Sequence, residues 1–217
     1  MKKYNYIFFD LDGTVVDSGE GIKKSASYAL KQYGINAVDE DSLNAFIGPP
    51  LKNSFMDIYG MNAEDAVKCI SFYREYYLEK GIFQGYVYSG MRELLSEITS
   101  NSIKAVLATS KPEVYAEMIL KHFKIDEYFT LISGATFDEK LVEKHDIILN
   151  TADRLGISDM SGVLMVGDRK FDIEGGKLAG TDTAGVLYGY GSYKELYAAG
   201  ADFIVSGSKD IINLLSL

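Results

Sequence analysis

The chain has 217 residues, 47% of them hydrophobic, so it can bury one substantial core or a core that carries an inserted domain. Its formal net charge of -9 argues against a surface for nucleic acid or an anionic membrane, because such surfaces need clustered lysine and arginine. The single cysteine, Cys69, excludes an intramolecular disulfide, and we expect its thiol to be buried. No run approaches the roughly 18 apolar residues of a membrane span, so we expect a cytoplasmic protein.

The first apolar run ends in two carboxylates. Residues 6–9 predict a buried strand, and Asp10 and Asp12 follow it with one leucine between them. Because side chains alternate along a strand, the two carboxylates would share one face at its end. Burying like charges so close together is costly unless a cation joins them or one keeps a proton, so function is the expected reason for the pair.

Strand patterns disappear between residues 17 and 85. Helical patterns take their place over residues 21–33, 41–46, 51–59 and 63–80. This predicts an inserted helical domain, residues 17–85, within a core domain formed by residues 1–16 and 86–217. The acidic triplet Asp39-Glu40-Asp41 follows no strand, and we interpret it as solvated acids at a helix start.

From residue 103 onward, short apolar runs alternate with helical patterns. We expect strands at residues 103–108, 129–132, 163–166, 183–187 and 203–205. We expect helices at residues 113–123, 146–155, 173–178 and 211–215. Repeated strand-helix units predict an α/β fold with a Rossmann-like parallel sheet and helices on both faces.

Polar side chains suited to phosphoryl transfer follow three of these strands, and ligands of open parallel sheets bind beyond the carboxyl ends of strands. In chain order they are Asp10 and Asp12, Thr109-Ser110-Lys111, and the segment from Asp168 to Asp172. Asp10 and Asp168 suit Mg²⁺, which prefers oxygen ligands. Asp10 is suited to attack a phosphoryl group, and Asp12 to act as acid and then as base.

These residues resemble the haloacid-dehalogenase-type phosphatases, over nearly the length of the chain. Residues 10–18 resemble the first motif of that family, and residues 167–172 resemble the fourth. Thr109 matches the hydroxyl of the second motif, and Lys144 is our choice for the lysine of the third, in competition with Lys140 and Lys111. By this resemblance Asp10 is the nucleophile and Asp12 the acid/base.

The resemblance also implies a Mg²⁺ site and a set of substrate contacts. The metal would be held by the Asp10 carboxylate, the Asp12 backbone carbonyl and Asp168. Asp172 would bind the metal directly, or it would support the metal or Lys144 without being a ligand. Candidate substrate contacts are Gly13, Thr14 and Ser110 from the core, with Gly48 and Arg74 from the insertion, which resembles the helical cap of the phosphoglycolate-phosphatase-like branch.

Two departures bear on the substrate. His145 follows Lys144 where many phosphoglycolate phosphatases have proline, and residues 133–148 with 188–192 look more like the branch labelled 5'-nucleotidase. The resemblance implies a small phosphorylated metabolite, a nucleoside 5'-monophosphate or phosphoglycolate, for a monomer or homodimer. A phosphomutase of the β-phosphoglucomutase type and a non-catalytic binding module remain alternatives. Dehalogenase chemistry is disfavoured, because Asp12 has no purpose in halide loss.

Overall fold

A parallel sheet forms the core of the computed structural model, which describes residues 3–36, 39, 42–137 and 140–217. The sheet has six strands in the order β5-β4-β1-β6-β7-β8, and all five neighbouring pairs are parallel. Their bounds are β1 Tyr6–Phe9, β4 Lys104–Pro112, β5 Phe129–Ala135, β6 Val163–Gly167, β7 Asp182–Val186 and β8 Phe203–Val205. The predicted parallel α/β fold is confirmed.

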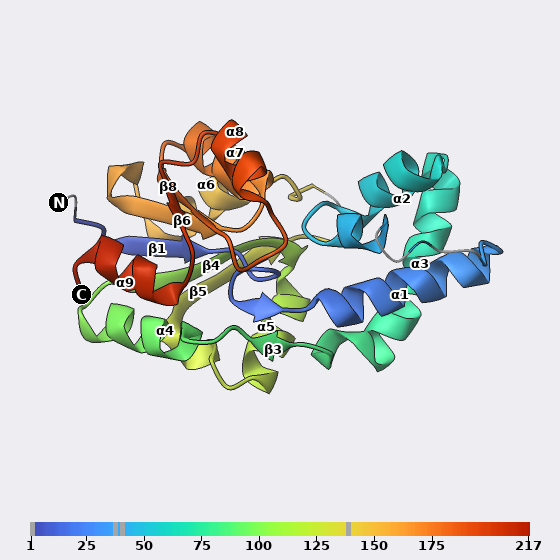
Figure 1. Ribbon diagram of the computed structural model, residues 1–217, viewed down its shortest axis with the longest axis horizontal. Coiled ribbons are helices and arrows are strands. Elements are labelled where there is room, and N and C mark those ends of the chain that lie inside the picture. The colour runs from blue at the N-terminus through green and yellow to red at the C-terminus, as the bar shows by residue number, and fades with distance from the viewer. Residues whose placement is uncertain (1–2, 37–38, 40–41, 138–139) are drawn as a thin grey trace. The chain divides into compact units, whose positions relative to one another are not determined.

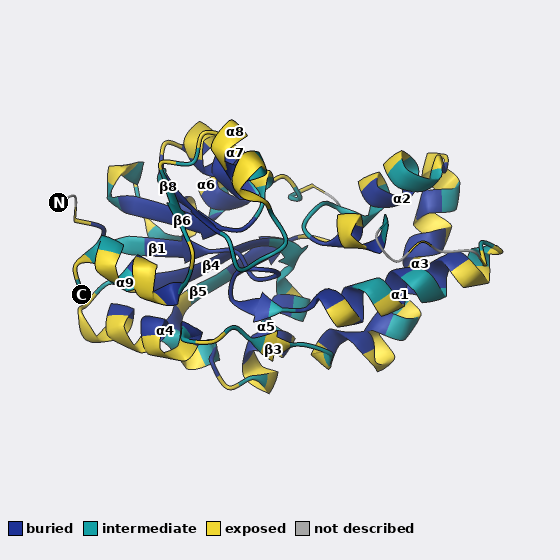
Figure 2. Ribbon diagram, in the orientation of Figure 1, coloured by how far each residue is buried: buried dark blue, intermediate teal, exposed yellow. Residues whose placement is uncertain are grey.

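Helices cover both faces of this sheet, with α6 and α7 on one side and α4 and α9 on the other (Figure 1). The bounds are α4 Met91–Ser100, α5 Glu113–His122, α6 Lys144–Leu155, α7 Lys170–Ala179, α8 Tyr193–Ala198 and α9 Ser208–Leu215. Phe8, Val106 and Met165 from three strands pack in one cluster with Ile147 and Ile148 of α6. The strands β1, β6 and β7 are accordingly almost fully buried, and the helices have exposed residues on their outer faces (Figure 2).

Several elements of this core differ from the sequence-based prediction, among them α7 and α9, which begin three residues earlier than expected, and α8, which was not predicted. Strand β4 runs to Pro112 instead of ending at Ala108, because its polar residues still pair with β5. Helix α6 begins at Lys144, two residues before the predicted start. Helix α4 was not predicted, although its buried face, formed by Met91, Leu94, Leu95 and Ile98, has helical spacing.

The chain divides into two compact units, one formed by Met1–Val16 with Val87–Leu217 and the other by Asp17–Tyr86. The short strands β2 (Val16–Asp17) and β3 (Tyr86–Val87), where the chain passes between the units, pair with each other. Among the described residues, no helix combines the length and apolarity needed to cross a membrane.

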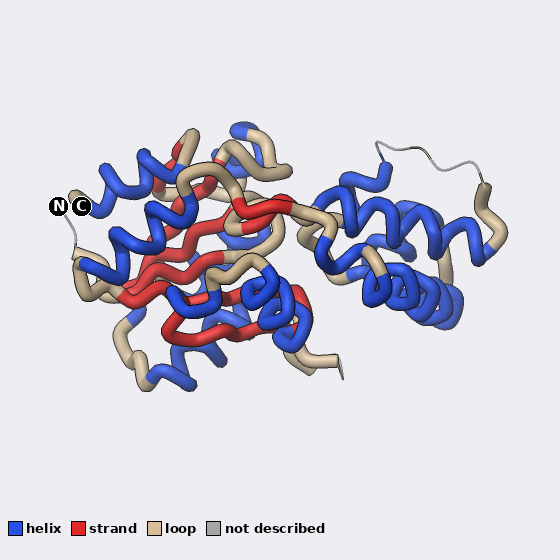
Figure 3. The backbone as a smooth tube through the Cα atoms, turned by 90° about the horizontal axis from the view of Figure 1, so that it is seen from below, coloured by secondary structure: helices blue, strands red, loops and turns tan. Residues whose placement is uncertain are grey.

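The second unit is built from helices (Figure 3). They are α1 Gly19–Tyr33, η1 Ser42–Phe46, α2 Leu51–Tyr59, α3 Ala63–Glu79 and η2 Gly81–Phe83. Element η1 is a short 3-10 helix, and Glu40 and Asp41, predicted at its start, lie outside the described residues. The core of the unit includes Phe46 and Phe55, whose rings meet edge to face, and the buried Cys69 thiol, as predicted.

Candidate active site

The carboxyl ends of three neighbouring strands bring the candidate site together. Strand β1 lies between β4 and β6, with Phe9 in register with Leu107 on one side and Val166 on the other. Asp10 follows Phe9 directly, and its amide donates to the Val166 carbonyl at 2.9 Å. Asp168 directly follows the last residue of β6, so the sheet itself places the two carboxylates side by side.

Three buried carboxylates gather at this edge. Asp10, Asp168 and Asp172 offer oxygen atoms that all lie within 4.8 Å of one another. The Nζ atom of Lys144 lies 2.8 Å from Oδ1 of Asp10 and 2.8 Å from Oδ1 of Asp172, and it donates to the Ala108 carbonyl at 3.1 Å. An ammonium has three N–H groups, so those of Lys144 are all used by the protein.

Burial strongly affects the ionisation of this cluster. Burial raises the pKa of Asp168 well above its usual range, and the charges of Asp172 and Asp10 add to the effect. Burial also raises the pKa of Asp172 to about 6, although the nearby Lys144 ammonium lowers it. Burial opposes the charge on Lys144, but the two carboxylates it touches raise its pKa above the ordinary value, so it stays an ammonium.

The donor set of the cluster fits a divalent cation. Asp10 and Asp172 bond to the Lys144 ammonium, and with all three carboxylates ionised this single positive charge leaves two negative charges of the cluster unbalanced. Uncompensated buried charge is costly, and clustered carboxylate oxygens are the ligands of hard cations such as Mg²⁺. The predicted ligands Asp10, Asp168 and Asp172 are therefore brought together, with a need for positive charge between them.

Gly13 and Thr14 form the turn after Asp12. Gly13 has φ of 85°, and a Cβ there would overlap the Asp168 carboxylate, so the position requires glycine on two grounds. Thr14 is fully buried, and its hydroxyl donates to Oδ1 of Asp168 at 3.3 Å. The structure thus places both predicted substrate contacts directly against Asp168.

Strand β4 brings a second lysine to the site. The Nζ atom of Lys111 lies 2.8 Å from Oδ2 of Asp12. Thr109, the predicted second-motif hydroxyl, is buried, and its Oγ1 accepts a hydrogen bond from the Lys111 amide at 3.2 Å. Ser110 is half-buried between them. The prediction missed the pairing of Lys111 with Asp12, although its place two residues after Thr109, on the same strand face, could have signalled it.

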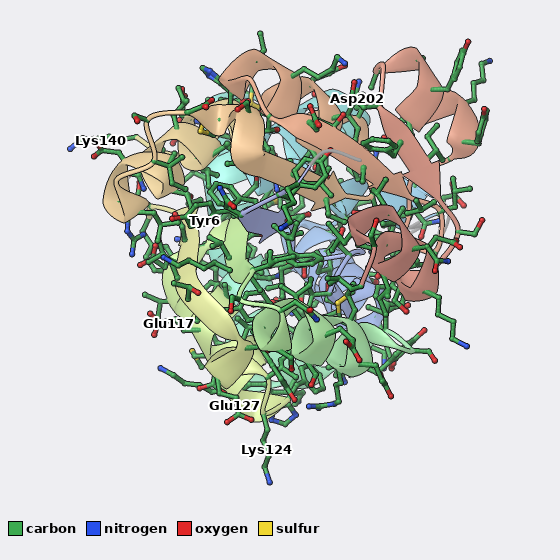
Figure 4. The ribbon with its side chains drawn as sticks, turned by 90° about the vertical axis from the view of Figure 1, so that its left-hand side faces the viewer. Tyr6, Glu117, Lys124, Glu127, Lys140 and Asp202 are labelled. Carbon is green, nitrogen blue, oxygen red and sulfur yellow. The ribbon has the colours of Figure 1, made fainter. Side chains whose placement is uncertain are left out.

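The remaining candidates lie elsewhere. Lys140, a rival of Lys144 in the sequence, is exposed and points away from the core at its rim (Figure 4). Gly48 and Arg74 belong to the helical unit, where Gly48 precedes α2 and Arg74 is half-buried on α3. Their role as substrate contacts stays a prediction.

Two backbone donors to the carboxylates were also missed. Oδ2 of Asp172 accepts from the Arg169 amide at 3.0 Å, and Oδ2 of Asp168 accepts from the Tyr190 amide at 2.7 Å. Backbone donors leave little trace in a sequence. The glycines beside Tyr190 are the one hint, because they allow the chain to approach closely.

Several known proteins resemble this chain over most of its length. A 5'-nucleotidase of Pseudomonas aeruginosa is 38% identical over 196 residues, which cover 90% of this chain and 88% of that protein. The tyrosine-protein kinase PtkA of Mycobacterium bovis is 32% identical over 207 residues, or 95% of this chain and 67% of that protein. The crystal structure of a predicted phosphatase from Clostridium acetobutylicum superimposes with a TM-score of 0.95 at 44% identity, covering 99% of this chain and 100% of that one.

The family model of haloacid dehalogenase-like hydrolases matches residues 7–186, a range that includes every residue of the carboxylate cluster and both lysines. The chain therefore belongs to the haloacid dehalogenase-like hydrolase family and is one of its phosphatases.

Proposed function

We propose that this phosphatase hydrolyses small phosphate monoesters through a phosphorylated Asp10, with Mg²⁺ as its cofactor. The observation that carries the proposal is the buried cluster of Asp10, Asp168 and Asp172 around the Lys144 ammonium. Nucleoside 5'-monophosphates are the first substrates to test, because the relative from Pseudomonas aeruginosa is named a 5'-nucleotidase. Phosphoglycolate is the second, from the resemblance of the insertion to a phosphoglycolate-phosphatase cap.

Asp10 and Asp168 would hold the Mg²⁺ ion, together with the backbone carbonyl of Asp12. Asp172 would hold Lys144 in place beside Asp10, because it accepts hydrogen bonds from the Lys144 ammonium and from the Arg169 amide. When bound, Mg²⁺ neutralises negative charge on the phosphoryl oxygens.

The reaction divides between the two carboxylates of the first motif. An oxygen of Asp10 attacks phosphorus, the bond between phosphorus and the ester oxygen breaks, and Asp12 gives its proton to the departing oxygen. Water then attacks the phosphorus of the aspartyl phosphate while Asp12 takes up a proton, which releases phosphate and restores Asp10. Lys144 holds Asp10 in one orientation throughout, through its 2.8 Å contact.

The test is phosphate release from a panel of nucleoside 5'-monophosphates, phosphoglycolate and sugar phosphates, in Mg²⁺ or in EDTA. Wild type is compared with Asp10→Asn and with Asp153→Asn, the same change at an exposed position of α6. We expect release that needs Mg²⁺, disappears in Asp10→Asn and persists in Asp153→Asn. Turnover by Asp10→Asn near the wild-type rate would remove Asp10 as the nucleophile.

A second candidate is phosphoryl transfer from ATP to a protein tyrosine, because one relative is named a tyrosine-protein kinase. Incubation with radiolabelled ATP and a tyrosine-containing peptide separates the two functions. Label on the peptide without release of free phosphate would favour the kinase.

A further inference from the structure

A loop between β7 and α8 touches the metal-binding edge from outside the four motifs. We call residues 187–192, with the sequence Leu-Tyr-Gly-Tyr-Gly-Ser, the glycine-tyrosine loop. The Tyr190 amide donates to Oδ2 of Asp168 at 2.7 Å. The Tyr188 hydroxyl donates to the Thr14 carbonyl at 3.0 Å, and its ring packs on that of Tyr88 with centroids 4.8 Å apart. The loop therefore contacts both the carboxylate and the turn beside it.

The two glycines explain how the loop comes so close. A Cβ on Gly189 would overlap the Gly13 carbonyl oxygen and the Asp168 side chain. A Cβ on Gly191 would overlap the Asp168 carbonyl oxygen. Real side chains never approach backbone atoms so closely, so the loop can rest on Asp168 only because both positions lack a side chain.

The loop completes the surroundings of Asp168. One carboxylate oxygen accepts from the Thr14 hydroxyl and the other from the Tyr190 amide, while the residue is fully buried. A carboxylate oxygen has two lone pairs, so each oxygen keeps one for a metal ion. The two donors fix the rotation of the carboxylate and leave it able to bind a cation.

We propose that the glycine-tyrosine loop is a positioning element that orients Asp168 for Mg²⁺ and so sets the affinity of the metal site. The inference rests on the proposed Mg²⁺ site. Hydrogen-bond partners of ligating carboxylates contribute roughly 10- to 100-fold to metal affinity, because they remove the cost of ordering the ligand on binding. Tyr190 acts through its amide and Tyr188 through the turn that carries Thr14.

The experiment measures the Mg²⁺ dissociation constant by isothermal titration calorimetry without substrate. Tyr190→Pro deletes the amide donor, and Tyr190→Phe keeps both the amide and the ring. We expect Mg²⁺ binding to weaken roughly 10- to 100-fold in Tyr190→Pro and to stay close to wild type in Tyr190→Phe. Saturating Mg²⁺ should restore kcat in the proline variant, which a general loss of structure would not allow.

Tyr188→Phe serves as the second variant, because it removes one hydroxyl without changing the shape of the ring. Circular dichroism and thermal unfolding without metal show which variants are folded. We expect Tyr188→Phe to weaken Mg²⁺ binding by about tenfold. The positioning role is overturned if those of the two variants that fold bind Mg²⁺ as tightly as wild type. A wild-type protein that binds no Mg²⁺ overturns the proposed metal site instead, so the two failures are distinct.

Discussion

The ammonium of Lys111 lies 2.8 Å from Oδ2 of Asp12, and the two side chains are only 7% and 11% exposed. Each carboxylate that follows β1 is thus paired with a lysine from a different element, Asp10 with Lys144 of α6 and Asp12 with Lys111 of β4. The two lysines contact different parts of the site, because Lys144 binds two of the clustered carboxylates and Lys111 binds the proposed acid/base. Their replacement should therefore have different consequences.

Lys111→Met should lower kcat and leave Mg²⁺ affinity near the wild-type value. Asp12 would lose the contact that fixes its carboxylate, and a positioned acid/base contributes about 100- to 10,000-fold to the rate, so we expect at least a tenfold loss. Steady-state kinetics and Mg²⁺ calorimetry measure the two effects. Lys121→Met is the control, because the ion pair of Lys121 with Glu117 of the same helix is exposed. An Mg²⁺ affinity that falls in parallel with kcat would contradict this division of roles.

Lys144→Met should destabilise the metal-free protein. It leaves Asp10 and Asp172 buried without their ammonium, and breaking a buried ion pair from one side costs about 3 to 5 kcal/mol. Because Lys144 lowers the pKa of Asp172, removal of Lys144 will raise that pKa further. At pH 5 Asp172 will then be protonated, and we expect part of the lost stability to be recovered.

Urea unfolding in EDTA at pH 7 and pH 5 measures the effect, with the exposed Lys140→Met as the matched control, expected within about 0.5 kcal/mol of wild type. A loss of the same size at both pH values would show that lost packing, not unpaired charge, is the cause.

The sequence was sufficient for the features that depend on strand ends. Asp10 and Asp168 could be placed together because each follows an apolar run, and parallel strands collect their carboxyl ends at one edge. The choice of Lys144 over Lys140 and Lys111 rested on resemblance alone. In the structure Lys144 is the first residue of α6, and its side chain reaches the carboxylate cluster.

Contacts that depend on tertiary packing could not be read from the sequence. The Thr14 hydroxyl and the Tyr190 amide meet the same carboxylate from positions 176 residues apart, and no local pattern encodes such a meeting. The extension of β4 to Pro112 was missed for a related reason, because its polar residues look like a loop until the partner strand is known. Helix α4 is different, since its apolar spacing was present in the sequence and was overlooked.

The stability of the metal-free protein should fall as pH rises from about 4 to about 6. The folded-state pKa of Asp172 is about 6, raised from 3.8 by burial, so within this window the folded state holds a proton that the unfolded state has released. Raising the pH through the window removes that stabilising proton. Urea unfolding at a series of pH values in EDTA should show a steeper decline for wild type than for Asp172→Asn. Parallel profiles for the two proteins would contradict the raised pKa.

Gly21→Ala should destabilise the helical unit, although alanine within a helix is more stable than glycine by about 1 kcal/mol. A Cβ on Gly21 would overlap the Gly81 carbonyl oxygen, where α1 and η2 meet, and backbone cannot move aside as a flexible side chain can. Overpacking of this kind costs about 1 to 3 kcal/mol, so the overlap outweighs the gain in helix propensity.

Cys69 provides a measurement specific to this unit, because it is the single cysteine of the chain and its side chain is fully buried on α3. A thiol reagent can reach it only when the unit opens, so the rate of reaction reports the population of open molecules. Each 1.4 kcal/mol of lost stability raises that population tenfold, and we expect Gly21→Ala to react about tenfold faster than wild type. Gln32→Ala, at an exposed position of α1, should react at the wild-type rate. Equal rates for all three proteins would contradict this prediction, because the added Cβ at the contact of Gly21 with Gly81 would then cost no stability.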